Sequence, residues 1–331
     1  MERMIRVIQF GLGPIGCATA RLVAERTGLQ LVGGIDVDPA KVGRDLGEVA
    51  GMARVGVPVV ATLEEALARE AADAALHTTS SYFPLFREQA EGLLKAGLDV
   101  VSTSEELSFP WHDNAEEADA LHKMAVQAGR TILGTGVNPG FLMDSLPLFL
   151  TALSQTVERI SIRRVINASK RRGPFQAKIG SGLTPEAFME RMEEGRMGHV
   201  GLPESIAMIF DTLGQTLARY ESSVEPVIAN ALTETEHFSV KPGMVKGLHQ
   251  TASGFTADGE LVSLTFIASL DSEEDSDTIT ISGRPNLEVT LKGTNGDLAT
   301  VAIAVNAIRR VVDAPPGLMT MRDLPIVSWS P

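Results

Sequence analysis

Short apolar runs alternate with amphipathic segments along the first 145 residues of the chain. The apolar runs at 5–10, 29–35 and 98–101 have the length of buried strands, whereas the segments between them carry apolar residues at helical spacing. Further strands are expected near 55–60, 71–77 and 131–136, with helices at 17–26, 62–70, 86–97 and 115–129. This alternation predicts an α/β fold whose N-terminal domain, residues 1–145, is a Rossmann domain with a doubly wound parallel sheet.

Past residue 145 the pattern changes. Helices are expected at 145–156, 184–195 and 203–220, and strands at 157–169, 234–240, 261–270, 277–283 and 286–293. The grouping predicts an α+β domain over residues 146–296, the candidate substrate and oligomerisation domain if the first domain binds a cofactor, and its acidic stretch 272–277 is expected to form a solvated hairpin loop. The helix at 298–312 is too apolar to lie free, so residues 297–331 are expected to pack back on the first domain.

A glycine-rich turn follows the first strand. Gly11 permits a tight turn, Gly13 lets backbone N–H groups approach a pyrophosphate, and Gly16 allows the helix to pack closely on the sheet. The helix start, with Pro14 and Ile15, then offers N–H donors to phosphates. Asp36, 20 residues beyond Gly16, is suited to a ribose hydroxyl. Together they predict dinucleotide binding; the alternative is a tight turn that binds nothing.

The choice between NAD and NADP is less well defined. Asp36 favours NAD because a carboxylate repels a 2′-phosphate, but Lys41 and Arg44 follow closely and can neutralise one. NAD is therefore favoured, with NADP tolerated. The hydroxyl-rich turn of Thr78, Thr79 and Ser80 follows another strand and is expected to line the cofactor, unless it only caps the next helix.

Two neighbouring acids, Glu105 and Glu106, occupy the loop after the strand at 98–101. A carboxylate there, beside the expected nicotinamide and next to the apolar stretch 109–111, can carry a proton in catalysis. The alternative is a pair of helix-start acids that interact with the helix dipole. Asn138, in the turn Gly134–Gly140, can bind a carboxamide or a polar group of a substrate, or can simply be a turn residue.

Basic residues cluster between 163 and 178 in an otherwise acidic chain. Arg164 and Arg171 are candidates for binding a substrate carboxylate, because arginine binds carboxylates through two hydrogen bonds; a solvated basic face is the alternative. His199, between Gly198 and Gly201, is a candidate substrate ligand or proton donor, although a lone histidine is more often structural. The six histidines show no paired spacing, so no metal site is expected.

Composition narrows the class of protein. The chain has 331 residues, enough for two domains, and a net charge of −13, which argues against nucleic acid as a partner. No apolar run approaches the roughly 18 residues of a membrane span. The single cysteine, Cys17, suits a reducing compartment, and the first strand starts too early for a signal peptide, so a cytoplasmic protein is expected.

Six segments of the chain carry a family resemblance. GLGPIG, VVSTSEELSFP, GTGVNPGFLMDSLP, KRRGPFQAKIGSGLT, GHVGLPES and AVNAIRRVVDAPPGL occur in this order over nearly its whole length. In these segments the chain resembles the 2,4-diaminopentanoate dehydrogenases and related amine dehydrogenases with a dihydrodipicolinate-reductase-like fold. It lacks the paired-histidine and lysine signature of the dihydrodipicolinate reductases themselves.

The resemblance implies NAD(P)-dependent oxidative deamination of 2,4-diaminopentanoate, or a similar amine, to a ketone and ammonia. It places the catalytic glutamate in SEEL, at Glu105 or Glu106, and the substrate-binding asparagine and histidine at Asn138 and His199. Two alternatives remain: an NAD(P)-dependent ketone or aldehyde reductase that does not use ammonia, and an inactive cofactor-binding regulator. By analogy with other antiparallel substrate domains, a homodimer is expected.

Overall fold

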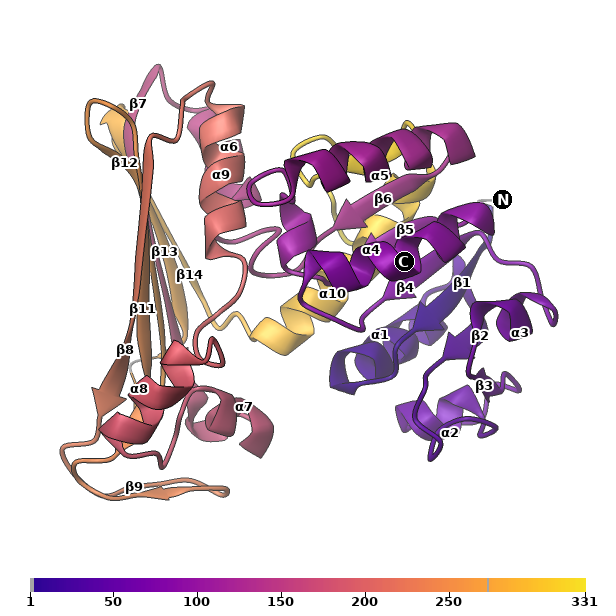
Figure 1. The fold of residues 1–331 in the computed structure, drawn as a ribbon, viewed down its shortest axis with the longest axis horizontal. Helices are drawn as coiled ribbons and strands as arrows, with labels where there is room; N and C mark the ends of the chain where they lie inside the picture. The colour runs from indigo at the N-terminus through magenta and orange to yellow at the C-terminus, as the bar shows by residue number, and fades with distance from the viewer. Residues whose placement is uncertain (1–2, 273) are drawn as a thin grey trace. The chain divides into compact units, whose positions relative to one another are not determined.

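The computed structural model describes residues 3–272 and 274–331. The chain divides into two compact units (Figure 1). The first unit runs up to Phe141 and includes Gly296–Pro331, and the second comprises Leu142–Asn295. These divisions lie within a few residues of the boundaries expected after 145 and 296. No helix within the described ranges is long and apolar enough to cross a bilayer.

The first unit contains a seven-stranded sheet in the order β15-β6-β5-β4-β1-β2-β3, and every neighbouring pair is parallel. The order reverses between β1 and β4, which is the switch point where such sheets bind ligands at the strands' carboxyl ends. The strands are β1 (Ile5–Phe10), β2 (Leu29–Ile35), β3 (Val59–Val60), β4 (Ala74–His77), β5 (Asp99–Ser102), β6 (Thr131–Gly134) and β15 (Gly317–Met319).

Helices cover both faces of this sheet, so its strands are apolar on both sides. One core lies between the sheet and the helices α1 and α10, and the other between the sheet and α3, α4 and α5. The predicted return of the C-terminal helix is confirmed, because α10 packs against α1, β4, β5 and β6. The helices of the unit are α1 (Pro14–Glu25), α2 (Leu46–Ala50), α3 (Leu63–Leu67), α4 (Phe83–Lys95), η1 (Glu106–Ser108), α5 (Ala115–Ala128) and α10 (Gly296–Val312).

The second unit is a six-stranded mixed sheet in the order β14-β13-β7-β12-β11-β8, in which only β7 and β12 pair in parallel. Figure 1 shows α6, α8 and α9 on one side of it. The strands are β7 (Thr156–Asn167), β8 (Arg219–Ile228), β11 (Val245–Phe255), β12 (Glu260–Ser269), β13 (Ser276–Arg284) and β14 (Leu287–Lys292), beside a small β9–β10 pair (Thr233–Glu234, Ser239–Val240). The helices are α6 (Ser145–Thr151), η2 (Ala168–Lys170), α7 (Gly173–Lys178), α8 (Pro185–Glu193) and α9 (Leu202–Thr212).

The predicted α/β fold class is confirmed, but several elements differ from expectation. The helix expected at 203–220 ends at Thr212, because Gly214 adopts a left-handed conformation (φ 65°) that stops it. The residues from Arg219 onward instead form β8, an edge strand whose mostly exposed side chains give no strand pattern. The elements β11, β15, α2 and α7 were also not predicted, the last three because they span six residues or fewer.

The acidic stretch 272–277 is only partly solvated. Residue 273 lies outside the described residues, and Asp277 is buried on β13, where it pairs with Arg164 of β7. The expectation of a wholly solvated loop was therefore wrong at Asp277. The register explains why, since Asp277 and Arg164 stand opposite each other on neighbouring strands.

Candidate functional site

The glycine turn after β1 has a geometry that three glycines make possible. Gly11 has φ 92°, and a Cβ there would lie 2.9 Å from Cγ2 of Thr79. A Cβ on Gly16 would overlap the carbonyl oxygen of Gly11, so α1 can approach the turn only because that side chain is absent. At Gly13, by contrast, nothing lies within 4 Å of the position of a Cβ. Gly13 is the N-cap residue of α1, so this open space lies at the N-terminus of that helix, where a pyrophosphate can bind.

A buried glutamine holds this turn. Nε2 of Gln9 donates to the carbonyl oxygen of Gly11 (3.0 Å) and to Oγ1 of Thr78 (3.1 Å), and Oγ1 of Thr78 itself donates to Gly11 (2.9 Å). Oγ1 of Thr19 donates to Oε1 of Gln9 at 2.7 Å. Gln9 was missed by the sequence reasoning, although a glutamine inside an apolar strand run was a visible signal.

Asp36 stands at the end of β2 with its carboxylate well bonded. Oδ2 accepts from the backbone N of Leu12 (2.8 Å) and from Nζ of Lys41 (3.0 Å), and Oδ1 accepts from the N of Asp38 (2.9 Å). Burial alone would raise the pKa of Asp36, but these hydrogen bonds outweigh it, so the pKa lies below its usual value. The carboxylate is thus charged at neutral pH and tied to the glycine turn through Leu12.

The hydroxyls of Thr78, Thr79 and Ser80 all have partners within the unit. Thr78 bonds the glycine turn, Oγ1 of Thr79 donates to Oε1 of Gln89 (2.7 Å), and Oγ of Ser80 accepts from the N of Tyr82 (3.0 Å). This bond of Ser80 closes a local turn before α4, whose N-cap is Tyr82, and is not a helix cap. Thr78 and Thr79 both contact the turn at Gly11, so they stay the stronger cofactor candidates of the three.

His77 is fully buried beneath this turn. Its Nδ1 lies 2.9 Å from Oγ of Ser102, and its Nε2 lies 2.6 Å from Oε1 of Gln89 and 2.9 Å from Oγ1 of Thr79. Burial lowers the pKa of His77 to about 4, because a charged imidazole would lose its hydration there. The network ties the end of β4 to the end of β5.

This burial predicts acid sensitivity. Between pH 6.5 and 4 the unfolded chain binds a proton at His77 that the native state does not, so native stability falls as pH drops, by about 1.4 kcal/mol per pH unit from this group. In His77→Gln, which lowers stability at every pH, this part of the slope is expected to vanish. Urea unfolding at pH 7.5, 5.5 and 4.5 measures how the free energy of unfolding depends on pH in the parent and in His77→Gln. An equal pH dependence in the two proteins would show that His77 is not the group responsible.

Glu105 and Glu106 differ in their surroundings. Oε2 of Glu106 accepts a hydrogen bond from the N of Phe83 (2.7 Å), the first residue of α4, so this carboxylate caps a helix. The N of Glu106 also donates to the carbonyl oxygen of Ser81 (3.1 Å). Glu105 immediately precedes η1 and is half-buried. Its backbone carbonyl oxygen accepts a hydrogen bond from the N of Ser108 (3.1 Å). Glu106 thus interacts with a helix N-terminus, as in the alternative interpretation, but the helix is α4 and not one that the two acids begin. Glu105 remains a catalytic candidate.

Two further hydroxyls lie where β5 and β6 end. Ser104 and Thr135 are 1% and 2% exposed, and Oγ of Ser104 and Oγ1 of Thr135 have no hydrogen-bond partner among the described residues. A buried hydroxyl without a partner costs about 1–3 kcal/mol, which a bound polar group can recover. These residues suit a carboxamide such as that of nicotinamide. Nothing in the sequence singled them out.

Asn138 is buried in the turn after β6. The bond from Asn138 to Pro139 is cis, and Gly140 has φ 115°. The N of Val137 donates to Oγ1 of Thr300 on α10 (3.2 Å), which fixes the turn to the returning helix. The glycine turn, Asp36, Thr78–Ser80, Glu105 and Asn138 therefore all follow the carboxyl ends of parallel strands in one unit, the edge where ligands bind.

The second unit holds the other three predicted residues on the helix-covered side of its sheet. Arg164 is 2% exposed, and its Nη1 pairs with Oδ1 of Asp277 at 2.6 Å. Burial lowers the pKa of Arg164; Asp277 opposes that shift, and the nearby charge of Arg171 adds to it. The guanidinium of Arg171 stacks on the ring of Phe175, 4.5 Å from its centroid. The guanidinium of Arg164 is already committed to the buried ion pair with Asp277, so Arg171 is the stronger candidate of the two for binding a carboxylate.

His199 lies in the loop before α9. Its imidazole stacks on the ring of Phe266, with centroids 4.9 Å apart and ring planes inclined by 20°. Phe266 stands opposite Arg164 in the register of β12 and β7, so His199 lies against a residue next to Arg164 in the sheet. Among the described residues no group of three or more potential ligands could hold a metal ion.

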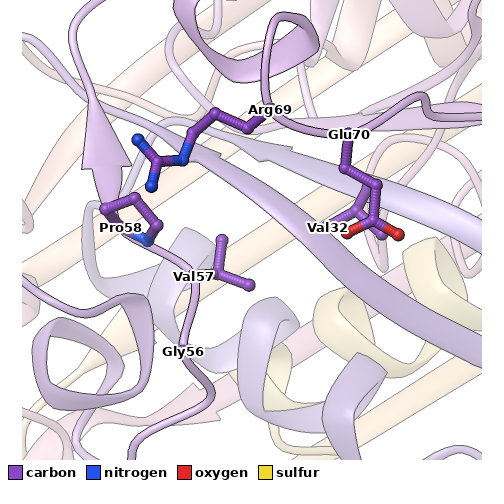
Figure 2. Close-up of a pocket in the computed structure, with 6 residues that line it drawn as sticks. All are labelled: Val32, Gly56, Val57, Pro58, Arg69 and Glu70. Atoms are coloured by element: carbon purple, nitrogen blue, oxygen red, sulfur yellow. The ribbon is translucent and has the colours of Figure 1, made fainter.

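A hollow of about 360 Å³ lies elsewhere in the first unit (Figure 2). Gly56, Val57 and Pro58 line it just before β3 begins, and Arg69 and Glu70 line it in the segment that leads into β4. It therefore opens at the amino ends of these strands. The residues of the candidate site follow the opposite ends, so this hollow is not part of it.

Comparison with known proteins gives consistent results over the whole chain. Residues 141–329 match the 2,4-diaminopentanoate dehydrogenase C-terminal domain, and residues 5–104 match the dihydrodipicolinate reductase N-terminus. The chain is 31% identical to the 2,4-diaminopentanoate dehydrogenase of Acetoanaerobium sticklandii, over 98% of this chain and 94% of that protein. It is 24% identical to an amine dehydrogenase of Streptomyces virginiae, over 98% and 97%.

Solved structures of related enzymes also resemble this chain. The amine dehydrogenase from Mycobacterium smegmatis superposes with a TM-score of 0.86 at 25% identity, over 98% of this chain and 97% of that one. A dihydrodipicolinate reductase from Paenisporosarcina, at 14% identity and a TM-score of 0.51 over 93% and 96% of the two chains, shares the fold.

Proposed function

The chain belongs to the 2,4-diaminopentanoate dehydrogenase family, and on that premise we propose that it reversibly deaminates 2,4-diaminopentanoate, or a similar amine, to the ketone and ammonia. It is an oxidoreductase that acts on amines. The observation that carries the proposal is the 31% identity over 98% of the chain to a 2,4-diaminopentanoate dehydrogenase. The dinucleotide turn and the acid after β5 supply the parts that this chemistry needs.

In the proposed mechanism Glu105 carries one proton. In the direction of amination its carboxylate takes a proton from ammonium, which frees the nitrogen lone pair to add to the ketone carbonyl. The resulting carbinolamine loses its hydroxyl as water when Glu105 returns that proton to the oxygen. When bound, a nicotinamide coenzyme would supply the hydride for the carbon of the iminium ion so formed, and would take it up in deamination.

Other residues position the reactants in this proposal. The open space at Gly13 and the N–H groups at the start of α1 receive the pyrophosphate, and Asp36 accepts from the ribose. Asn138, together with Ser104 and Thr135, holds the carboxamide or a polar group of the substrate. Arg171 binds a substrate carboxylate, and His199 is a second substrate ligand. Positioning supplies much of the rate, because ammonia, ketone and coenzyme must meet in one place.

The decisive assay follows oxidation of NADH and of NADPH with 2-amino-4-oxopentanoate, with and without an ammonium salt. We expect turnover only when ammonium is present. Equal turnover without it would support a ketone reductase instead. No turnover with a panel of amines and ketones, in either direction, would support a cofactor-binding regulator.

For the coenzyme we propose NAD, with NADP tolerated. Lys41 is the residue that makes NADP acceptable, because its Nζ already lies 3.0 Å from Asp36 and 3.6 Å from Asp38 and can turn to a 2′-phosphate. In Lys41→Met we expect kcat/KM for NADPH to fall about tenfold, equivalent to one charge-assisted hydrogen bond, and that for NADH to change by less than about threefold.

Lys95→Met is the matched control, since Lys95 is exposed on α4 and its Nζ lies 3.4 Å from a carboxylate oxygen of Glu91, far along the chain from Asp36. Its steady-state constants with both coenzymes should match those of the parent. A parallel loss of NADH and NADPH activity in Lys41→Met would show that Lys41 supports the fold of the β2 end rather than the choice of coenzyme.

We also propose a homodimer. The six-stranded sheet of the second unit carries alternating Ser and Thr side chains on the face away from α9, among them Ser161 and Ser263, whose hydroxyls lie 2.9 Å apart. No helix of the described residues covers that face of the unit in Figure 1. Light scattering should give twice the chain mass of 35.3 kDa.

A further inference from the structure

Four side chains form a row across the sheet of the second unit. Gln250 of β11 stands opposite Phe266 of β12, Phe266 stands opposite Arg164 of β7, and Arg164 stands opposite Asp277 of β13. All four are buried on the helix-covered face. Directly opposite residues on neighbouring strands have Cβ atoms about 5 Å apart, so the row is continuous. His199 rests on one end of it.

Gln250 clamps the backbone of His199 with both ends of its amide. Oε1 accepts from the N of His199 at 2.6 Å, and Nε2 donates to the carbonyl oxygen of His199 at 3.1 Å. Gln250 is only 7% exposed, so these bonds are shielded from water. Such a pair fixes the peptide groups on both sides of one residue, as a neighbouring strand would do.

Phe266 fixes the imidazole in turn. The two rings are stacked within 20° of parallel, so the plane of His199 follows the plane of Phe266. Phe266 is itself held between Gln250 and Arg164, and Arg164 is held by its ion pair with Asp277. The backbone and the ring of His199 are thus fixed by adjacent members of the same row.

The glycines around His199 are consistent with a loop shaped to fit this clamp. Gly198 has φ 101° and Gly201 has φ 97°, conformations that other residues rarely adopt. A Cβ on Gly198 would lie 3.3 Å from Oε1 of Gln250, so the loop approaches the amide closely at this point. The backbone turns at Gly198 and Gly201 thus allow His199 to contact both Gln250 and Phe266.

We infer that Gln250 and Phe266 are positioning residues that orient the imidazole of His199 toward the amine substrate. This inference rests on the proposed function, in which His199 is a substrate ligand. A rigid sheet holds a ligand side chain more accurately than a loop alone, so loss of this support should weaken binding of the substrate that the side chain contacts. Neither residue need touch the substrate itself.

The test uses Gln250→Leu, which removes both bonds of the clamp, and Gln250→Glu, which keeps an acceptor for the N of His199 but loses the donor. Gln215→Leu is the matched control, because Gln215 is exposed in the same unit. In Gln250→Leu we expect KM for the amine to rise roughly tenfold or more while kcat and the KM for the coenzyme change less than about threefold. Gln250→Glu should lie between it and the parent, and Gln215→Leu should match the parent.

A second readout does not depend on activity. The ring protons of His199, identified by their absence from the NMR spectrum of His199→Asn, should be shifted upfield by the ring of Phe266. That upfield shift should be lost in Phe266→Leu and reduced in Gln250→Leu. The control Gln215→Leu should keep the melting temperature of the parent. Because this signal is independent of turnover, it still reports on the clamp if Gln250→Leu is poorly active.

The outcomes separate the two claims. If the parent turns over no amine, the proposed function fails, whatever the NMR spectra show. If the parent is active and Gln250→Leu moves the His199 signals but leaves the amine KM unchanged, the positioning role is wrong. If the His199 signals do not move in Gln250→Leu, the clamp does not hold the imidazole and the inference is likewise overturned.

Discussion

Replacing Glu105 by Gln is expected to lower kcat by about 10²- to 10⁴-fold, the range lost when a general acid–base group is removed. The side chains are nearly the same size, so the fold should tolerate the change. The amide can neither take the proton from ammonium nor return it to the leaving hydroxyl. Binding of NAD(H), measured by titration of the reduced coenzyme's fluorescence, should stay within about threefold of the parent.

Glu106→Gln is the control that makes this result specific. An amide oxygen can still accept the hydrogen bond from the N of Phe83, so the cap of α4 should survive and kcat should change by less than about threefold. Glu106→Ala removes the cap and should destabilise the protein by about 0.5–2 kcal/mol, measured by urea unfolding. If Glu106→Gln lost activity and Glu105→Gln did not, the roles of the two acids would have to be exchanged.

Replacing Gly13 by Ala should weaken dinucleotide binding while leaving the fold intact. No atom lies within 4 Å of the new methyl group, and the backbone of Gly13 (φ −68°, ψ −175°) is one that alanine adopts readily. The methyl group would project into the space proposed for the pyrophosphate. Overpacking of about 1–3 kcal/mol corresponds to a Kd raised roughly 5- to 150-fold.

Two other glycines serve as controls for Gly13→Ala. Gly92→Ala places a methyl group on the exposed side of α4, where it meets only Cδ2 of Leu63 at 3.9 Å; it should stabilise the protein by about 0.5–1 kcal/mol without changing the Kd. Gly16→Ala would collide with the Gly11 carbonyl and should lower the melting temperature as well as the affinity. A Kd unchanged in Gly13→Ala would show that the phosphates do not pass over this turn.

The first unit was predictable because its signals are local. A strand, three glycines, a helix start and an acid fall within 32 residues, and each has its own steric or electrostatic requirement. The predicted fold class and the family resemblance are confirmed. Gln9 escaped notice because its role depends on β4, which lies more than 60 residues away in the sequence.

The second unit was less predictable because its contacts depend on register. Asp277 reads as one of several solvated acids until the sheet places it opposite Arg164. Gln250 and Phe266 carry no motif, and only the pairing of β11 with β12 makes them one surface. Likewise, nothing in the sequence distinguishes Glu106 as a helix cap from Glu105, because the capped residue, Phe83, comes 23 residues earlier. The roles given to Glu105, Arg171 and His199 stay predictions.

Isotope transfer tests the central claim most directly. The enzyme is given 2-amino-4-oxopentanoate, ¹⁵N-ammonium and NADH deuterated at the transferable position of C4, and the product is analysed by mass spectrometry. The account predicts a diamino acid that carries one deuterium and one new ¹⁵N on the former carbonyl carbon, and a Glu105→Gln enzyme that makes little of it. A deuterated hydroxy acid without ¹⁵N would contradict the account, because hydride would then have reached a carbonyl rather than an imine.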